Sequence, residues 1–511
     1  MKKILISTFL SISSLVSYGQ DFVDTTIDSE VTSVQPMTGI VFWPGNKDIT
    51  TDAISLEYSY MDFSQIVTTK SVYDWTVVDN LLDEMASRNH QAVLRFRYSY
   101  PGKTTTVPQY IKDLPDYTET EGISEGRTTW FPDWTNAELK RFTLEFYTKY
   151  AERYDSDPRL AFVQVGFGLW AEYHIYDGPF ELGKTFPSKA FQTEFFNHLS
   201  NVFINTYWSI SIDAADATYS PIEAEPILKD INFGVFDDSF MHQSHAGYNT
   251  SNWNFFGRDR YKIAPAGGEF SYYTDYDQRN VLNPDEGPYG VPYEIFAQNF
   301  HITYINGNDQ NNYQTLDRIK EASMNSGYKF KITSFKTKVD SSIVEVINLG
   351  VAPIYIDAFV AVNGVRSSQS LKLLAPDSTS IFNISAGGAN STLTIESDDI
   401  LPTQTIEYFG TINDYQRYIQ PPDVTLGIEP QNGAGLFSIY PTISDSGMVH
   451  IDYLGKGKYD ISLYTQLGKL VYHKTQSTSS LINTSDYKAG LYILTLKTAD
   501  NKIIRHKLVF R

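Results

Sequence analysis

The chain has 511 residues, 14% of them aromatic, no cysteine, and a formal net charge of -19 at pH 7. Without cysteine, disulfides, thiolate metal sites and a cysteine nucleophile are excluded. The negative balance disfavours nucleic acid and anionic membranes as partners, and the length predicts two or three domains.

Residues 1–19 have the pattern of a secretory signal peptide. Lys2 and Lys3 form a basic start, a mostly apolar stretch follows over 4–16, and Ser17 and Gly19 offer small side chains for cleavage. The stretch is too short to span a bilayer, and no later run is long enough to do so. We therefore expect an exported mature protein, secreted or held at the cell surface, without membrane insertion.

Residues 20–322 alternate between strand-like and helix-like patterns. A clear helical stripe occupies 136–154, where Leu139, Phe142, Phe146 and Tyr150 share one face. About eight strand candidates alternate with helices or long loops, at 38–43, 54–63, 91–98, 161–170, 209–213, 231–236, 263–269 and 301–305. This predicts a closed (β/α)8 TIM barrel. An open doubly wound sheet is the alternative, disfavoured because no Gly-rich phosphate loop follows the first strand.

The pattern changes after the predicted barrel. Short segments within 323–412 alternate at period two, with Gly, Pro, Asn and Ser between them, which predicts a β-sandwich domain. Residues 413–435 are rich in Pro, Asn and Gln and read as a linker. The last stretch, 436–511, is β-rich again.

Motifs in 436–511 resemble the C-terminal sorting domain of type IX secretion. They are an opening Tyr440-Pro441, a Leu467-Gly-Lys469 turn, an Ala489-Gly-Leu-Tyr-Ile493 strand and a basic, apolar end at Lys507–Arg511. Thr442 and Ile443 depart from the family's usual Asn and Pro. The resemblance implies an export address that binds the type IX machinery and has no part in catalysis. A small accessory β-domain is the alternative.

Two glutamates end strand-like runs of the predicted barrel. Glu172 ends 160–172, and Glu269 ends 263–269. In a (β/α)8 barrel both carboxylates lie at the C-terminal face, and paired carboxylates are the equipment for cleaving a glycosidic bond. The apolar Trp170 and Ala171 before Glu172 predict a raised pKa, as a general acid needs. The alternatives are loop acids or ion-pair partners.

The two glutamate motifs resemble the retaining glycosidases of clan A. In that clan the acid/base glutamate ends the fourth strand and the nucleophile ends the seventh, which are the predicted positions of Glu172 and Glu269. Ala171 stands where the clan has the Asn that contacts the sugar 2-hydroxyl. Gly168-Leu-Trp-Ala-Glu-Tyr-His174 and Gly267-Gly-Glu269 look like a poorly characterised branch near the β-galactosidase-like barrels.

Further substrate-binding candidates lie near predicted strand ends. Arg95 and Arg97 share one strand face and are suited to orienting a carboxylate or holding an anionic sugar group, with a structural ion pair as the alternative. Asp237 and Asp238 are rival catalytic carboxylates, or hydroxyl ligands, and Asp213 is similar. The histidine candidates, with loop hydrogen bonding as the alternative role, are His174, His242 and His245.

Aromatic and basic residues complete the predicted site. Trp43, Trp170 and Trp253 are candidates for stacking on sugar rings, against core packing. Arg258 begins a basic cluster with Arg260 and Lys262, which would receive sulfate or carboxylate groups if it lies beside the site. A solvated face is the alternative. No spacing fixes a metal geometry, so we expect neither metal nor cofactor.

These observations predict a secreted glycoside hydrolase using retaining double displacement. The substrate would be an extracellular plant or algal polysaccharide cut by endo action, with a sulfated galactan or fucan as one candidate. Retention needs carboxyls about 5 Å apart, and a gap of about 6.5–9.5 Å implies inversion. The alternatives are a non-catalytic carbohydrate-binding or adhesion protein on the same scaffold, and a polysaccharide lyase.

Overall fold

The computed structural model separates the chain into two compact units, Met1–Tyr418 and Ile419–Arg511. It describes 21–417 with gaps at 243–245 and 285–290. It also describes 437–510 with gaps at 441–442, 445–447, 454, 466–468, 486, 489 and 500–502. The predicted signal peptide, most of the predicted linker and His245 lie outside the described residues.

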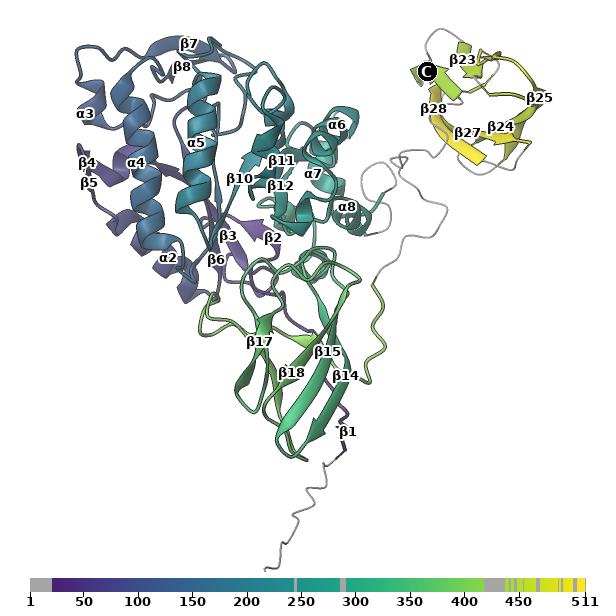
Figure 1. The fold of residues 1–511 in the computed structure, drawn as a ribbon. Coiled ribbons are helices and arrows are strands. Elements are labelled where there is room, and N and C mark those ends of the chain that lie inside the picture. The colour runs from purple at the N-terminus through teal and green to yellow at the C-terminus, as the bar shows by residue number, and fades with distance from the viewer. Residues whose placement is uncertain are drawn as a thin grey trace, which may run out of the picture. The chain divides into compact units, whose positions relative to one another are not determined.

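A closed barrel of eight strands forms the larger part of the first unit (Figure 1). Each strand is parallel to its neighbours, and the last closes on the first where Tyr304 pairs with Gly39. The strands are β2 (Gly39–Phe42), β3 (Leu56–Asp62), β6 (Gln91–Arg97), β9 (Leu160–Gln164), β10 (Tyr207–Ser211), β11 (Gly234–Phe240), β12 (Ala266–Phe270) and β13 (Tyr304–Asn306). The prediction of a (β/α)8 barrel is confirmed.

Helices cover the outside of the barrel. The predicted stripe lies on α4, where Asn136 caps the helix by accepting from the Leu139 amide, and Phe146 packs on Phe96 of β6 at 4.8 Å. Figure 1 shows α4 and α5 side by side. The helices are α1 (Phe63–Ile66), α2 (Thr76–Ser87), α3 (Gln109–Lys112), α4 (Ala137–Tyr154), α5 (Lys189–Val202), α6 (Ala246–Phe256), α7 (Asp275–Asn280), α8 (Tyr293–Phe300) and α9 (Leu316–Met324).

Short 3-10 helices and two β-hairpins lie in the loops of the barrel. The 3-10 helices are η1 (Ile212–Ala215), η2 (Pro226–Asp230), η3 (Arg260–Lys262) and η5 (Gln310–Asn312). Two hairpins pair β4 (Val67–Thr69) with β5 (Val72–Tyr73), and β7 (Thr120–Ser124) with β8 (Arg127–Phe131). The second hairpin follows β6, so it rises from the C-terminal end of the barrel.

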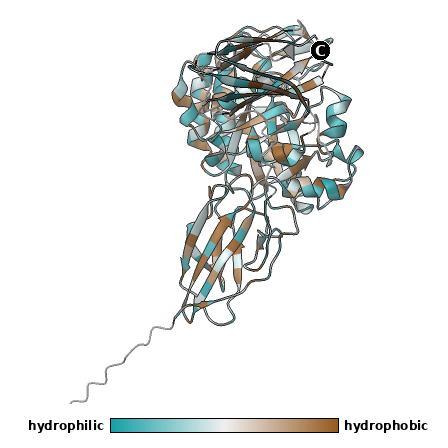
Figure 2. Cartoon of the chain, turned by 90° about the vertical axis from the view of Figure 1, so that its right-hand side faces the viewer, coloured by the Kyte–Doolittle hydropathy of each residue, from teal (hydrophilic) through white to brown (hydrophobic). Residues whose placement is uncertain are grey.

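Two antiparallel sheets form the β-sandwich region that follows. In β15, buried residues alternate with half-buried ones, and Figure 2 shows brown and teal segments alternating along these strands. One sheet holds β1 (Val23–Asp24), β14 (Phe330–Lys338), β15 (Ser341–Asn348) and β18 (Thr379–Ile384), with β20 (Tyr408–Phe409) pairing β14 in parallel. The other holds β17 (Val365–Ser370), β16 (Phe359–Val362) and β19 (Leu393–Glu396). Because β1 pairs with β14, the segment before the barrel joins the sandwich.

The sandwich packs on the N-terminal end of the barrel. The Tyr355 hydroxyl donates to the carbonyl of Tyr261 at 2.6 Å, and His301 Nδ1 lies 2.7 Å from the carbonyl of Val351. Tyr261 and His301 precede β12 and β13. The sandwich therefore covers the end of the barrel opposite to the one where barrel enzymes place their chemistry.

The second unit is a small β-structure of its own. One sheet holds β21 (Phe437–Tyr440), β23 (Met448–Tyr453) and β26 (Ser480–Asn483), and the other holds β22 (Ile443–Ser444), β28 (Ile503–Phe510), β27 (Gly490–Thr498), β24 (Tyr459–Thr465) and β25 (Leu470–Gln476). Ile461, Leu463 and Leu494 are fully buried in its core. Across the residues described in both units, no helix has the length and apolar character needed to cross a membrane.

Candidate active site

A cavity of about 980 Å³ opens among the loops at the C-terminal ends of the barrel strands. Its lining combines eight acidic and eight aromatic side chains. Eight of the residues predicted from sequence line it, namely Trp43, Trp170, Glu172, His174, Asp213, Asp237, Asp238 and Glu269. The strand-end positions therefore converge on one cleft, although they are widely separated in the chain.

Glu172 reaches the cleft on a tight reversal of the chain. The predicted strand 161–170 is too long, since β9 ends at Gln164. The amide of Glu172 donates to the carbonyl of Leu169 at 2.9 Å, and both residues between them, Trp170 and Ala171, have positive φ, at 53° and 59°. Such a backbone costs about 1 kcal/mol or more per residue and persists where the surroundings impose it.

Gly168 allows this reversal to close. A Cβ at Gly168 would overlap the carbonyl oxygen of His174, because the returning chain passes directly against it. The amides of Phe167 and Gly168 both donate to the carbonyl of Glu172. The glycine spacing that the sequence shows before Glu172 therefore serves to bring Glu172 and His174 back over the barrel mouth.

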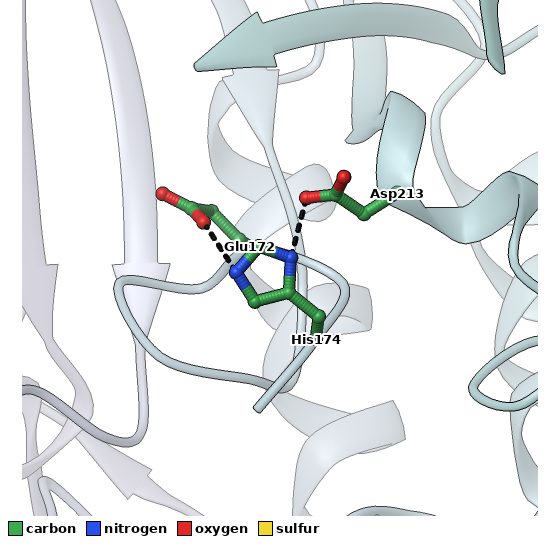
Figure 3. Close-up of side chains that lie close together, drawn as sticks. All are labelled: Glu172, His174 and Asp213. Atoms are coloured by element: carbon green, nitrogen blue, oxygen red, sulfur yellow. Dashed lines mark ion pairs between the residues drawn. The ribbon is translucent and has the colours of Figure 1, made fainter. Parts of the chain in front are cut away.

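Glu172, His174 and Asp213 form a chain of ion pairs (Figure 3). His174 Nε2 lies 3.2 Å from Glu172 Oε2, and His174 Nδ1 lies 2.6 Å from Asp213 Oδ2. Burial would lower the pKa of His174, but the charge and hydrogen bond of Asp213 outweigh it, so this pKa is raised above its ordinary value. The imidazolium form can donate to both carboxylates.

The same three side chains have the composition of a metal site, since one ligand atom from each lies within 4.8 Å of the others. Each ring nitrogen of His174 faces a carboxylate oxygen, however. A metal needs a deprotonated ring nitrogen with its lone pair directed at the ion. The arrangement fits a protonated histidine between two acids better than it fits a metal ligand, and the expectation of no metal stays a prediction.

Asp238 forms an ion pair with a buried arginine of β6, Arg95. Arg95 Nη2 lies 2.9 Å from Asp238 Oδ1, and Arg95 Nε donates to Gln164 Oε1 at 2.7 Å. Among the described residues, the buried Asp238 Oδ2 has no hydrogen-bond partner. Burial raises the pKa of Asp238, although the charge of Arg95 opposes the shift.

Glu269 is held by the neighbouring strand. Asn306 Nδ2 donates to Glu269 Oε2 at 2.6 Å. Burial, followed by the charge of Asp238, raises the pKa of Glu269 to about 8, against opposing effects of Arg95 and Asn306. Gly267 before it is required because a Cβ there would meet the ring of Tyr304 at 2.5 Å.

The carboxyl groups of the mouth raise one another's pKa. Burial, then the charges of Asp238 and Asp213, raise the pKa of Glu172 well above its ordinary value. Burial raises the pKa of Asp237 to about 7. Because closely spaced like charges in a buried site cannot all ionise together, the mouth retains protons near neutral pH. It therefore contains both an acid able to donate a proton and anions able to stabilise positive charge.

Aromatic residues form walls of the cleft. Trp43 packs on Tyr60 with ring centroids 5.5 Å apart, and Trp170 stacks on Tyr176 at 5.8 Å with an interplanar angle of 8°. Arg97 shares the face of Arg95, as predicted, and both guanidinium groups lie over the ring of Tyr60. Arg97 also pairs with an aspartate of β3, Asp62, at 2.9 Å, and it is not among the residues that line the cavity.

Besides Arg95 and Arg97, three predicted substrate contacts are absent from the lining of the cleft. His242 is buried with its Nδ1 against Asp277. Trp253 is buried as well, and its Nε1 donates to Asp237 Oδ2 at 3.1 Å, so it braces Asp237 instead of stacking on sugar. Neither belongs to the lining.

Arg258 is the third of these corrections. It donates to the carbonyl of Asn299 and lies over the ring of Phe300. Arg260, beside it, is buried among backbone carbonyls. Both residues precede β12, which places them toward the N-terminal end of the barrel. The prediction of a basic cluster beside the site is therefore wrong. The expectation of a sulfated substrate rested on that cluster and loses its support.

The sequence analysis missed several lining residues. Asn308 and Asp309 follow β13, so the rule that found Glu172 and Glu269 would have found them had it been applied to the eighth strand. Glu125 lies in the turn between β7 and β8, and Tyr272 and Tyr273 follow β12 in a loop. The same rule applied to the residues after β12 would have found the two tyrosines, whereas Glu125 carries no pattern that separates it from ordinary surface residues.

The fold and the site define a class: a (β/α)8 barrel with a carboxylate-rich mouth at the C-terminal ends of its strands. Residues 438–511 match the family described as the secretion system C-terminal sorting domain, which confirms the prediction for the end of the chain. None of the curated proteins matches this chain.

Solved structures resemble parts or most of the chain at low identity. The tri-modular endo-beta-1,4-glucanase B from Bacillus halodurans is 8% identical, with 94% of this chain and 98% of that chain covered and a TM-score of 0.34. The alpha-galactosidase TtGalA from Thermus thermophilus is 11% identical over 60% of this chain and 64% of its own, with a TM-score of 0.34. A DUF3244 family protein from Bacteroides vulgatus has an immunoglobulin-like β-sandwich fold and is 14% identical. The match covers 14% of this chain and 82% of that chain, with a TM-score of 0.13. Values this low leave the activity to be argued from the site.

Proposed function

We propose that the protein is an exported glycoside hydrolase acting by retaining double displacement, with endo action on an extracellular polysaccharide. The observation that carries this proposal is the meeting of Glu172 and Glu269 in one aromatic-walled cleft at the C-terminal end of the barrel. Two carboxyl groups on one cleft are what glycoside cleavage requires, one to donate a proton and one to engage the anomeric carbon.

In the first step the Glu269 carboxylate attacks the anomeric carbon while the glycosidic C–O bond breaks. Glu172 gives its proton to the departing oxygen. In the second step Glu172 takes a proton from water, the water oxygen attacks the anomeric carbon, and the Glu269 carboxylate leaves with its electron pair. The raised pKa of Glu172 keeps the acid form available near neutral pH.

The remaining side chains of the cleft fit supporting roles. Asn306 orients Glu269 through its hydrogen bond, and His174 orients Glu172. Asp238, fixed by Arg95, places negative charge where the sugar ring becomes cationic. Trp43 and Trp170 offer apolar faces against which sugar C–H groups can pack.

Export follows from the end of the chain. The sorting-domain match over 438–511 supports delivery to the cell surface or the medium through the type IX machinery, which is then a partner of this segment. An enzyme delivered there meets polymers too large to import, which favours a polysaccharide over a small glycoside.

The test is release of new reducing ends by the full-length protein from a panel of neutral, amine-bearing and sulfated polysaccharides. Glu172→Gln and Glu269→Gln should each remove nearly all release while the circular dichroism spectrum stays that of the wild type. Glu121→Gln, in the β7–β8 hairpin outside the cleft lining, is the matched control and should retain full activity. Binding of a polysaccharide without new reducing ends would instead favour a carbohydrate-binding or adhesion protein.

Stereochemistry tests the mechanism separately. Proton NMR of the first product formed should show the anomeric configuration of the substrate. Inverted product would keep the hydrolase and overturn double displacement. Unsaturated products, visible as a rise in ultraviolet absorbance, would indicate a lyase.

A further inference from the structure

The charge of the cleft lining is one-sided. Among the described residues, it contains eight carboxyl groups, one histidine, and neither lysine nor arginine. The acidic residues are Glu125, Glu172, Asp213, Asp216, Asp237, Asp238, Glu269 and Asp309. Arg95 forms an ion pair with one of these acids, Asp238, and is itself 3% exposed.

Most of these acids lack a cationic partner within the chain. In the described parts of both units, five of the eight form no ion pair with lysine, arginine or histidine: Glu125, Asp216, Asp237, Glu269 and Asp309. Two basic side chains pack behind this lining without pairing with its acids, since Arg97 pairs with Asp62 and Lys103 lies over the ring of Tyr100. The acids that are ionised can therefore still pair with positive charge on a ligand.

Exposed aromatic rings stand among these carboxyl groups. Tyr176, Tyr272 and Tyr273 line the cleft and are 53%, 47% and 64% exposed. The Tyr176 hydroxyl donates to the carboxylate of Glu125 at 2.6 Å, which holds ring and charge together at the rim. An aromatic face beside a carboxylate binds an ammonium group, through the ring quadrupole and the charge, better than it binds a neutral group.

We propose that the cleft binds glycans whose sugars carry free, protonated amines, such as glucosamine or galactosamine polymers. This inference rests on the proposed function, whose reaction it leaves unchanged, and it names the substrate class. The ammonium groups supply the missing counter-charges, and the aromatic rim packs against the sugar faces. Sulfated and uronic glycans are repelled by the same field.

The same arrangement predicts that the number of protons bound by the cleft changes when a cationic glycan binds. Burial and mutual repulsion raise the pKa of Glu269 to about 8 and that of Asp237 to about 7, so both hold protons in the free cleft near neutral pH. A bound cation favours the ionised forms and lowers these pKa values. Binding of an amine-bearing glycan should therefore release protons, and binding of its N-acetylated counterpart should not.

The experiment is isothermal titration calorimetry on the full-length Glu172→Gln variant, which binds without turnover. The probes are a chitosan oligosaccharide, the N-acetylated oligosaccharide of equal length, and a sulfated galactan oligosaccharide, at about pH 6 where the amines are protonated. EDTA in all samples prevents bridging by divalent cations. Two buffers of different ionisation enthalpy report the protons released.

We expect the chitosan oligosaccharide to bind at least about tenfold more tightly than the N-acetylated one. This advantage should shrink with added salt, because the rim charges are exposed and screened. Adding Glu125→Gln and Asp309→Asn should reduce it further, whereas adding Glu121→Gln should not. Equal affinity for the two oligosaccharides, preference for the sulfated one, or no binding of the chitosan oligosaccharide would each overturn the inference.

Failure of this inference is distinguishable from failure of the proposed function. Reducing ends released by the wild-type protein from neutral polysaccharides, without preference for amines, would overturn the inference and leave the hydrolase. Tight binding of chitosan oligosaccharide with no cleavage of any glycan would support the inference and overturn the hydrolase.

Discussion

The two ends of the barrel differ in how completely their buried charged side chains are paired. At the N-terminal end, Glu57 is fully buried with both oxygens bound, since Arg88 donates to them at 2.8 and 2.7 Å and His90 lies 2.9 Å away. Arg260 donates to three backbone carbonyls at the same end. These groups have the partners that a buried charge needs for stability.

At the C-terminal end, the carboxyl groups outnumber their partners. Arg95 pairs with Asp238, and Glu172 shares His174 with Asp213. Among the described residues, the hydrogen-bond partner found for Glu269 is the neutral amide of Asn306. Burial, followed by the charges of neighbouring acids, raises the pKa values of Glu172, Asp238 and Glu269. Perturbed and incompletely paired groups gather at functional sites, so the contrast separates charges that hold the fold from charges available to a ligand.

The largest effect is expected on activity, from replacing the proposed general acid at the mouth of the barrel. Glu172→Gln should lower kcat/KM by about 10²–10⁴, the usual contribution of a general acid, because the amide has no proton to give. Thermal stability should be unchanged or higher, since a buried acid is replaced by a neutral group of similar shape. Steady-state kinetics and a thermal melt of the same sample check both. A fall in melting temperature with activity retained would reverse the assignment of the two ends.

The next largest effect is expected on stability, from the matching substitution at the N-terminal end of the barrel. Glu57→Gln should destabilise the protein by about 3 kcal/mol, because Arg88 and His90 lose the anion between them. Urea unfolding monitored by fluorescence measures the change. Activity per folded molecule should equal that of the wild type. Loss of activity without loss of stability would show that Glu57 acts on the site.

The pH dependence of kcat/KM tests whether Glu269 is the nucleophile. Glu269 must be ionised to attack, and its pKa of about 8 in the free site means that kcat/KM should rise with pH toward about 8. Asn306→Ala removes a hydrogen bond that favours the anion, so this acidic limb should move to higher pH. A limb near the ordinary glutamate pKa in both proteins would exclude Glu269 as the nucleophile.

A smaller effect is expected from the ion-pair chain. Asp213→Asn removes the charge that raises the pKa of His174, so the imidazole should lose its proton and its hold on Glu172 at a lower pH. We expect kcat/KM to fall by about tenfold, part of the full acid–base contribution. NMR titration of the His174 ring reports its pKa directly. An unchanged ring pKa would show that Asp213 does not control this histidine.

The smallest expected effect is on stability against pH. Because the pKa of Glu269 is about 8 when folded and near its ordinary value of 4.5 when unfolded, the folded state binds more protons between these values. Stability attributable to Glu269 is therefore lost as pH rises through this window. Glu269→Gln should raise the melting temperature at alkaline pH by about 2 °C or more, and not at pH near 4. Equal melting temperatures at both pH values would contradict the burial of this charge.

Local patterns predicted much of this molecule. The period of apolar residues separated barrel from sandwich, and the apolar stripe of α4 is the one that packs on the barrel. Placing Glu172 and Glu269 at one end of the barrel needed only the rule that parallel strands share a direction. The error at Arg258 came from the same rule used too loosely, since a residue before a strand lies at its opposite end.

The sequence by itself determined the eight strands, the order of the regions and the two glutamates at strand ends, because periodicity and turn residues act over short stretches of chain. Only the tertiary structure decided that His174 lies between Glu172 and Asp213, and that Trp253 faces Asp237 and not the cleft. It also brought Glu125, from a surface hairpin, to the rim. Closing the barrel and folding loops back over it joins residues far apart in the chain, and pKa values depend on those distances and on burial, which no local pattern encodes.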